Sequence, residues 1–441
     1  MTDPARQATA GRRQQRLHAR ASVVCWLALG LSVAAYVVIS TAVFHQPFHV
    51  GMRKLRYFDL KVYRGAAELV LHAHPLYGHR IMRHLGFTYP PATALALLPL
   101  TLASITVDSR VLTAINIVLL VWTLRRTVSL WRSSNWAAGN RFFTGLNDWT
   151  IAAAAAALAL WLEPVTTTLG YGQVDLIITA LVVFDLSRPD TARTKGAAIG
   201  LAAGLKLTPL IFIPYLLLSG RGRAALWSVG AFIGTIVVSF AVVGGDAFDY
   251  WTKVIFDTRI VGSVADASNQ SLQGAAARLT GVTSPGALAM AFVVLVAVVA
   301  VALAARASRR GDDATGFWLC AVASLLVSPI SWTHHWALAV PALLLLVLSA
   351  YGQRSRWRWL AAAVMAAVGY SYLPELLESR RPGAPRGLWD SLGADSYVIL
   401  GLAAVILAGF ALLRHRQERL PPPEVVNTPD QEDESAVPLS A

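Results

Sequence analysis

Long apolar stretches alternate with shorter polar segments over most of the 441 residues. The first stretch, 22–44, follows a basic N-terminal segment and is long enough to cross a bilayer as one helix. It lacks a small-residue cleavage motif, which favours a spanning helix over a signal peptide. Nine more apolar stretches follow at 111–130, 149–163, 173–186, 223–244, 286–306, 314–328, 335–352, 358–374 and 395–413. This pattern predicts an all-α polytopic membrane protein.

Basic residues are concentrated in every second connection between these stretches. Cytoplasmic loops of membrane proteins carry an excess of Lys and Arg, so we assign the basic connections to the cytoplasmic side. These connections are Arg125–Arg132, Arg188–Lys195, Arg221–Arg223, Arg306–Arg310, Arg354–Arg358 and Arg414–Arg419. The remaining connections, which are then external, are 45–88, 163–172, 245–285, 329–334 and 375–394.

Two further apolar segments do not fit as single spans. Segment 196–219 has basic residues on both sides, and Lys206 and Pro209 interrupt its middle. We therefore expect two helical halves that return the chain to its starting side. Segment 89–104 is expected to form a re-entrant or broken hairpin. The resulting organisation has about 12 transmembrane helices in residues 22–415, a basic cytoplasmic N-terminus at 1–21, and a disordered cytoplasmic tail at 416–441.

Composition supports the membrane assignment. Hydrophobic residues make up 55% of the chain and charged residues 14%, against roughly 25% charged in soluble domains. The net charge of +13 resides mainly in short segments between apolar stretches. This distribution differs from the basic stripe with aromatics of a nucleic-acid-binding protein, and we expect no nucleic-acid partner. Cys25 and Cys320 each lie inside an apolar stretch, which argues against a disulfide or zinc framework.

Polar residues with possible chemistry gather near the predicted outer face. Apolar and polar positions recur at helical spacing from Leu60 to Leu71, which predicts a helix lying on the membrane surface. Asp59 precedes that helix, where it could serve as the N-cap or as a general base. Tyr89, beside the helix-breaking pair Pro90–Pro91, fits the role of an interfacial aromatic.

Charged and amide side chains also occur at the ends of apolar stretches. Glu163, Gln173 and Asp175 lie at or near the predicted outer edge of the membrane, where an acidic group usually faces a partner or a cavity. Lys206 is one of only five lysines and lies well inside an apolar segment at the predicted break. Too far from a helix end to reach water easily, its ammonium is suited to meet a phosphate.

Two later segments add candidate binding groups. The 245–285 loop contains Arg259 and the amides Asn269 and Gln270, a composition typical of a sugar-binding cluster, although polar loops are more often simply solvated. His334 and His335 stand between two tryptophans at the start of a span. They would point about 100° apart on a helix, so we expect one of them to face a site, where it could donate a proton or bind phosphate. We see no further ligands at metal-binding spacing.

Six short motifs occur in a characteristic order: FDLKVY, FTYPP, GYGQVD, GLAAGLKLTP, NQSL and SPISWTHH. Together they resemble the actinobacterial glycosyltransferases of the GT-C superfamily, over about residues 20–415. The sequence is similar in particular to family 87, the polyprenol-phosphate-mannose-dependent α-1,2-mannosyltransferases, and within it to members that extend phosphatidyl-inositol mannosides.

The resemblance implies a GT-C fold and an inverting transfer of mannose from polyprenyl-phosphate mannose to a mannosylated phosphatidyl-inositol, of the tetramannoside-to-pentamannoside type. The reaction would occur at the outer face of the plasma membrane, with Asp59 as general base. Lys206 and His335, with His334 as the alternative histidine, would bind the donor phosphate. No metal or cofactor is expected with a monophosphate leaving group. Candidate substrate-binding residues are Tyr63, Tyr89, Glu163, Gln173, Asp175, Arg259, Asn269 and Gln270.

Two other functions remain open from the residues alone. An arabinofuranosyltransferase on the same scaffold would need the same base and cations but a polyprenyl-phosphate arabinose donor. A lipid or sugar transporter would share the broken helices and the buried lysine. A transporter predicts polar pathways to both membrane faces, whereas the polar candidates of this sequence concentrate on one.

Overall fold

The computed structural model describes residues 4–42, 57–82, 85–134, 143, 145–257, 260–282, 286–380 and 387–417. The described chain is helical, with two isolated β-bridges, Met82 to Leu85 and Asn269 to Trp332. The predicted contact residue Arg259 and most of the predicted tail lie outside the described residues. The helices of the N-terminal half are α1 (Pro4–Ala42), α2 (Phe58–Leu71), α3 (Pro91–Ala96), η2 (Leu98–Thr101), α4 (Ile105–Arg132), α6 (Asp148–Ala159), α7 (Glu163–Tyr171), α8 (Asp175–Leu186), α9 (Ala197–Leu205), η4 (Thr208–Ile211) and α10 (Phe212–Leu218).

The second half continues in the same way. Its helices are α11 (Gly222–Thr252), η5 (Val254–Phe256), α12 (Leu272–Thr280), α13 (Ala287–Arg309), α14 (Asp313–Val327), η7 (Thr333–Ala339), α15 (Val340–Gly352), α16 (Arg356–Ser371), α17 (Leu373–Arg380), α18 (Leu388–Ala394) and α19 (Ser396–Gln417).

Six helical segments of the described chain are long and apolar enough to cross a membrane, or up to eight if each of two bent pairs counts as one span. The six are Gln14–Ser40, Ile105–Arg132, Gly222–Phe256, Ala287–Arg309, Thr333–Gly352 and Arg356–Glu378; the bent pairs are α6 with α7 and α18 with α19. The all-α polytopic prediction is therefore confirmed. The predicted count of about 12 spans is larger because it includes shorter apolar stretches, such as α8 and α14, which form helices of 12 and 15 residues.

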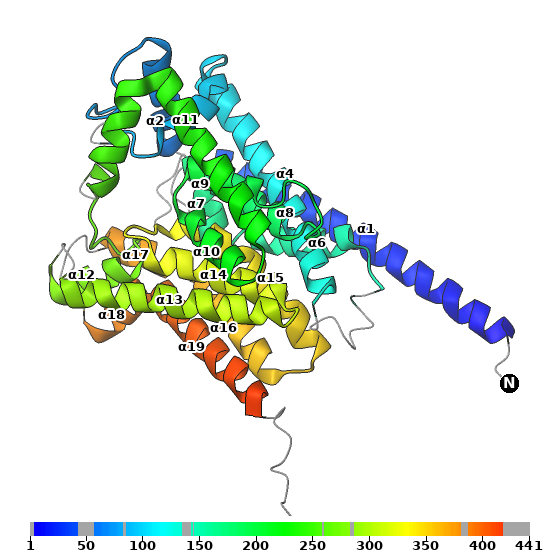
Figure 1. The fold of residues 1–441 in the computed structure, drawn as a ribbon. Coiled ribbons are helices and arrows are strands. Elements are labelled where there is room, and N and C mark those ends of the chain that lie inside the picture. The colour runs from blue at the N-terminus through cyan, green and yellow to red at the C-terminus, as the bar shows by residue number, and fades with distance from the viewer. Residues whose placement is uncertain are drawn as a thin grey trace, which may run out of the picture.

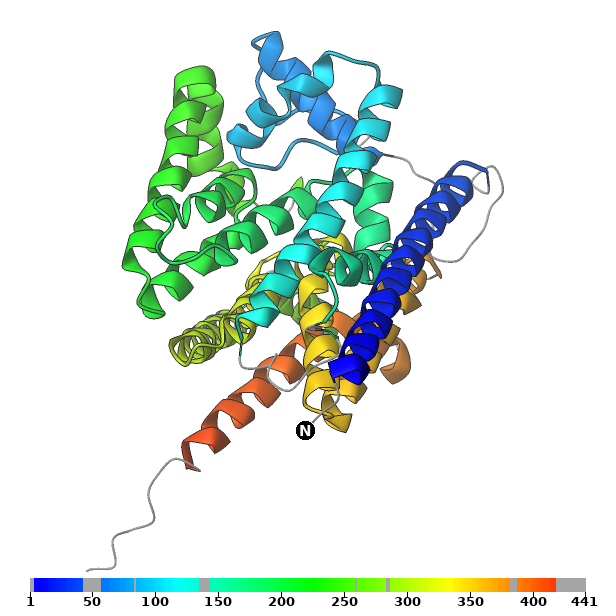
Figure 2. The same cartoon turned by 90° about the vertical axis from the view of Figure 1, so that its right-hand side faces the viewer.

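The helices pack in a continuous core rather than in separate units. α4 contacts α6, α8 and α15, and α9 contacts α8 and α11. α14 joins α13 to α19 and to η7. α1 packs mainly against α6 and lies along the side of the molecule in Figure 2. Much of its outer surface consists of exposed apolar residues such as Leu27 and Leu31, as expected of a helix that contacts lipid.

The predicted surface helix is α2, at the top of Figure 1. It packs against α3, η2 and α7 through a buried face that includes Leu60 and Tyr63. On the opposite side of α2, Arg64 forms an ion pair with Asp108 of α4, with Arg64 Nη1 2.7 Å from Asp108 Oδ2. The alternative interpretation of Asp59 as the N-cap was wrong. Tyr57 is the N-cap, in a left-handed conformation, and Asp59 lies in the first turn.

Three predicted connections are corrected or refined by the structure. The predicted loop 163–172 forms a helix, α7, because Leu162 and Pro164 give the chain a helix start directly after α6 ends. Segment 89–104 forms only the short helices α3 and η2, in agreement with the predicted break. The break in 196–219 is also confirmed: α9 ends at Leu205, Lys206 has an extended backbone, and η4 follows.

The junction between α7 and α8 depends on Gly172. This residue has a φ of +70° and ends α7 in the left-handed conformation that glycine adopts without strain. A Cβ at this position would lie 2.7 Å from the Cβ of Leu60 on α2. Gly172 therefore lets α2 approach the start of α8, where Gln173 and Asp175 lie.

Substitution of Gly172 by alanine tests this close approach. We expect Gly172→Ala to lower the free energy of unfolding by more than the approximately 1–2 kcal/mol of a left-handed alanine, because the new methyl group also overlaps Leu60. Gly220→Ala is the matched control, since Gly220 has a φ of +86° but open space around the Cβ position. Thermal unfolding in detergent compares the two variants, and equal shifts of the midpoint would contradict the steric argument.

Candidate active site

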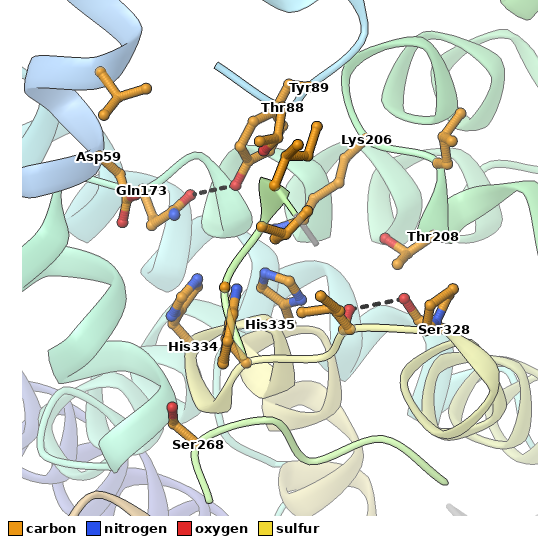
Figure 3. A pocket seen from close by; sticks show the side chains of 18 of the residues that line it. Asp59, Thr88, Tyr89, Gln173, Lys206, Thr208, Ser268, Ser328, His334 and His335 are labelled. Atoms are coloured by element: carbon orange, nitrogen blue, oxygen red, sulfur yellow. Dashed lines mark hydrogen bonds between the residues drawn. The ribbon is translucent and has the colours of Figure 1, made fainter. Parts of the chain in front are cut away.

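A cavity of about 760 Å³ opens beside the N-terminal end of α2. Its walls come from segments far apart in the sequence: α2, the 85–90 segment, the α7–α8 junction, the α9–η4 break, segments 254–257 and 260–268, the 328–335 segment and α17. Figure 3 shows Asp59 and Gln173 on one side of this cavity, with Lys206 and the two histidines nearby. The structure thus brings together most of the polar residues singled out in the sequence.

Asp59 lines the cavity from the first turn of α2. Its side chain is hydrogen-bonded to Gln173, and burial raises the pKa of the carboxyl from its ordinary value of 3.8 to about 6. The hydrogen bond with Gln173 and the positive charge of Lys206 each lower this pKa, while the negative charge of Asp175 raises it. The result is a carboxylate that is ionised at neutral pH and still basic enough to accept a proton.

Lys206 forms a buried ion pair with Asp175 at the α9–η4 break. The Lys206 Nζ lies 2.6 Å from Asp175 Oδ1, and the two residues are 8% and 4% exposed. The ammonium also lies 5.4 Å from the centre of the Tyr89 ring. Thr93 of α3 fixes the end of α9 by donating a hydrogen bond of 2.6 Å to the carbonyl of Leu205. Lys206 is therefore held as a cation at the cavity wall.

Both histidines line the cavity, which corrects the expectation that only one would do so. They occupy the start of a 3₁₀ helix, η7, rather than the middle of an α-helix, and their ring centres lie 4.6 Å apart. His334 Nε2 is 4.0 Å from Asp175 Oδ2 and has no hydrogen-bond partner. Neither ring nitrogen of His335 has one. These buried nitrogens are available to a ligand.

Asp175, His334 and His335 could together hold a metal ion, because their ligand atoms all lie within 4.8 Å of one another. However, the ammonium of Lys206 is already bonded to Asp175 and would repel a second cation. A lysine cation beside unpartnered imidazole nitrogens is better matched to an anion such as a phosphate. The donor set therefore fits a phosphate better than a metal.

Four of the predicted substrate-binding residues that the structure describes lie outside the cavity lining: Asp175, which is paired with Lys206, and Glu163, Asn269 and Gln270. Glu163 is fully buried at the start of α7 and accepts a hydrogen bond of 2.9 Å from the hydroxyl of Tyr397. The Asn269 side chain accepts from the Ser331 amide and donates to the Val264 carbonyl. Gln270 bonds with backbone groups of Ala267, Ala394 and Tyr397. The two amides are thus directed at backbone groups rather than into the cavity.

Several lining residues were not singled out as site residues in the sequence. Trp332 lines the cavity, although its position beside the histidines is typical of an interfacial aromatic. Ser268 also lines it, directly before Asn269 and Gln270, which the sequence singled out instead. Glu375 and Glu378 reach the cavity from α17. Their only signal was their place in a segment assigned to the outside, since the sequence does not reveal that α17 and α2 line the same cavity.

An ionisable carboxylate and a buried cation face one cavity, and the chain has several helices of membrane length. These features are those of a membrane enzyme that transfers a chemical group. The chain belongs to glycosyltransferase family 87, whose family model matches residues 87–329. The matched segment includes Tyr89, Gln173, Asp175 and Lys206, while Asp59 and the histidines flank it.

Curated relatives extend the similarity over most of the chain. A "polyprenol-phosphate-mannose-dependent alpha-(1-2)-phosphatidylinositol mannoside mannosyltransferase" of Mycobacterium tuberculosis is 29% identical over 88% of this chain and 91% of its own. The protein of the same description from Mycolicibacterium smegmatis is 31% identical over 80% and 83%. A "phosphatidylinositol pentamannoside mannosyltransferase" of M. tuberculosis is 32% identical over 84% of each chain. No solved structure matches.

The Lys206–Asp175 pair makes a testable contribution to stability. Removing one partner leaves the other charge buried without compensation, so we expect Lys206→Met or Asp175→Asn alone to destabilise the protein by about 3–5 kcal/mol. The double variant Lys206→Met/Asp175→Asn removes both charges and should lose less than the sum of the single variants. Thermal unfolding in detergent measures all three. Losses that simply add would show that the two charges do not depend on each other.

Proposed function

We propose that this chain is an inverting mannosyltransferase that transfers mannose from polyprenyl-phosphate mannose to a phosphatidyl-inositol mannoside in α-1,2 linkage. The observation that carries the proposal is the placement of Asp59 and the Lys206–histidine group on one cavity. The sequence relation to enzymes with this printed activity supports the choice of donor and acceptor. Further support comes from the order of the six motifs, which contribute residues to this cavity or to the segments around it.

Asp59 is the proposed general base. A hydroxyl of the acceptor mannose is a weak nucleophile until a base accepts its proton as the new bond forms. The hydroxyl oxygen attacks the anomeric carbon of the donor from the face opposite the phosphate. A single displacement converts the β-linked donor into an α-linked product. The Asp59 carboxylate, which opens onto the cavity and is held in place by Gln173, suits this step.

The leaving group departs toward the cationic side of the cavity. The bond between the anomeric carbon and the phosphate oxygen breaks, and the oxygen keeps the electron pair. The polyprenyl phosphate therefore gains negative charge, which positioned cations and hydrogen-bond donors stabilise. We assign this role to Lys206, His334 and His335, and we assign to Asp175 the role of holding the lysine by its 2.6 Å ion pair.

The remaining lining residues fit a lipid-linked donor. Apolar side chains also line the cavity and would provide a surface for a polyprenyl chain; they include Leu207, Leu210, Ile211, Val254, Ile255, Ala297 and Val327. We further propose about 12 membrane-spanning segments, cytoplasmic termini, and a cavity that opens at the outer face of the plasma membrane, where a lipid carrier must supply the sugar. The alternation of basic connections supports this orientation.

The other candidate residues take different roles in this proposal. Tyr63 and Tyr89 line the cavity beside Gln173. Glu163, Asn269 and Gln270 support the walls through their internal hydrogen bonds, and Arg259 remains a predicted contact of the acceptor.

For the acceptor we propose the phosphatidyl-inositol tetramannoside. The printed names of the relatives include both a mannoside and a pentamannoside acceptor, so the acceptor panel must contain both.

The decisive experiment is transfer of radiolabelled mannose by the purified protein. Polyprenyl-phosphate mannose is offered with tetra- and pentamannosylated phosphatidyl-inositol, with and without a chelator. We expect an α-1,2-linked product from the tetramannoside at a rate that the chelator does not change. Transfer from a polyprenyl-phosphate arabinose donor instead would replace the sugar, and substrate movement across proteoliposomes without covalent transfer would replace the enzyme by a transporter.

The role of Asp59 is tested by substitution and pH. We expect Asp59→Asn to lower turnover by a factor of about 10²–10⁴, while the matched control Asp249→Asn, at a half-exposed carboxylate outside the cavity lining, leaves it unchanged. Because the base must be ionised and the Asp59 pKa is about 6, wild-type activity should be constant above that pH and fall about tenfold for each unit below it. Activity that persists unchanged to pH 4.5 would exclude Asp59 as the base.

A further inference from the structure

Gln173 is bonded on several sides at the junction of α7 and α8. Its Oε1 accepts hydrogen bonds from the hydroxyls of Tyr63 and Tyr89, the second over 3.2 Å. Its backbone carbonyl accepts a bond of 3.1 Å from Asn116 Nδ2 on α4. The residue is 2% exposed. Three other elements therefore fix both the backbone and the side chain of Gln173.

These bonds determine which way the amide group points. A phenol hydroxyl can donate to the amide oxygen, so the two tyrosines hold Oε1 on their side. The amide nitrogen then faces the opposite side, where the Asp59 carboxylate accepts a hydrogen bond from it. The reverse orientation would place the amide oxygen against a carboxylate, and two acceptors cannot bond to each other. Figure 3 shows Gln173 between Asp59 and Tyr89.

We propose that Gln173 is a positioning residue, oriented by Tyr63 and Tyr89, which binds one oxygen of the Asp59 carboxylate and leaves the other oxygen for the acceptor hydroxyl. This inference rests on the proposed function of Asp59 as general base. It replaces the predicted role of Gln173 in substrate binding by a role that acts through Asp59. The side chains of the two tyrosines then serve the base as well as forming the cavity wall.

The bond has a defined electrostatic consequence. A donor that binds the ionised form of a carboxyl stabilises that form and lowers the pKa. The other charged or titratable groups that act on Asp59 are Lys206, Asp175 and the two tyrosines. A change at Gln173 leaves the Lys206–Asp175 pair in place, so the contribution of the amide can be measured separately.

The first test compares pH profiles of kcat/KM for the wild type, Gln173→Met and Tyr63→Phe. Methionine keeps the length of the side chain but cannot donate. We expect the acid limb of Gln173→Met to move up by about one pH unit, the value of one hydrogen bond to a charged group. Tyr63→Phe should move it in the same direction by no more than that. The double variant should show no further shift, because Tyr63 acts through the amide.

The matched control is Tyr250→Phe, the same change at a tyrosine that also lines the cavity but packs against Tyr77 and Trp251 rather than Gln173. Its acid limb should stay at the wild-type position. An unshifted acid limb in Gln173→Met, with turnover reduced or not, would overturn the inference. Fully additive shifts in the double variant would also overturn it, since the tyrosine would then act on Asp59 directly.

A second readout needs no substrate. Water-soluble carbodiimides react with protonated carboxyl groups, so the extent of Asp59 labelling, measured by mass spectrometry of the peptide, falls as pH rises through the Asp59 pKa. We expect the midpoint of this fall to move up in Gln173→Met and to remain in place in Tyr250→Phe. A moved midpoint in a protein that transfers no mannose would refute the proposed function and keep the Gln173 contact. An unmoved midpoint in an active enzyme would do the reverse.

Discussion

The structure of the site depends on the buried ion pair between Lys206 and Asp175. Neither charge is stable at this depth without the other, because desolvation of a single ion costs several kcal/mol. Lys206 stands where α9 ends, and Asp175 stands where α8 begins. The pair therefore requires two helix ends to meet at one point beside a cavity. The Lys206 ammonium donates one of its three hydrogens to Asp175, and the other two remain for a ligand.

The same meeting point positions Asp59, the proposed base. Asp175 lies only three positions after Gly172, the glycine that lets α2 approach the α7–α8 junction. Gln173 lies between them and reaches Asp59 on α2. The spacing within GYGQVD therefore has a structural reason. Gly172 allows α2 to approach, Gln173 binds Asp59 of α2, and Asp175 pairs with Lys206. One short segment thus positions both Asp59, the proposed base for the acceptor hydroxyl, and Lys206, the proposed ligand of the departing phosphate.

More than half of the site residues predicted from the sequence line the cavity, and several of them were found because polar groups are unusual in or beside an apolar segment. A lysine inside an apolar segment and an aspartate at the start of a span are costly unless they are used; Lys206 lines the cavity, and Asp175 forms an ion pair with it. The sequence could not reveal how polar groups in loops are satisfied. Asn269 and Gln270 looked like sugar ligands, yet their amides bond to backbone groups that water would otherwise have to reach. The sequence also did not reveal that Tyr57, in a left-handed conformation, is the N-cap of α2, and this is why the interpretation of Asp59 as the N-cap was wrong. Hydropathy does not distinguish a lipid-facing helix from a short buried one, so the count of about 12 spans stays a prediction beside the six to eight that length and composition support in the described chain.

The buried amides outside the cavity nevertheless affect the chemistry through the backbone. Asn269 accepts from the Ser331 amide, and Trp336 donates to the Gln270 carbonyl, so the 269–270 segment is bonded to both sides of the histidine pair. Gln270 also binds the Tyr397 amide on α19, which links that segment to the last helix. Because both imidazoles lie on a short 3₁₀ helix with few constraints of its own, these bonds fix where His334 and His335 stand relative to Lys206. If the histidines bind the donor phosphate as proposed, loss of either amide would weaken that binding without removing a proposed phosphate ligand.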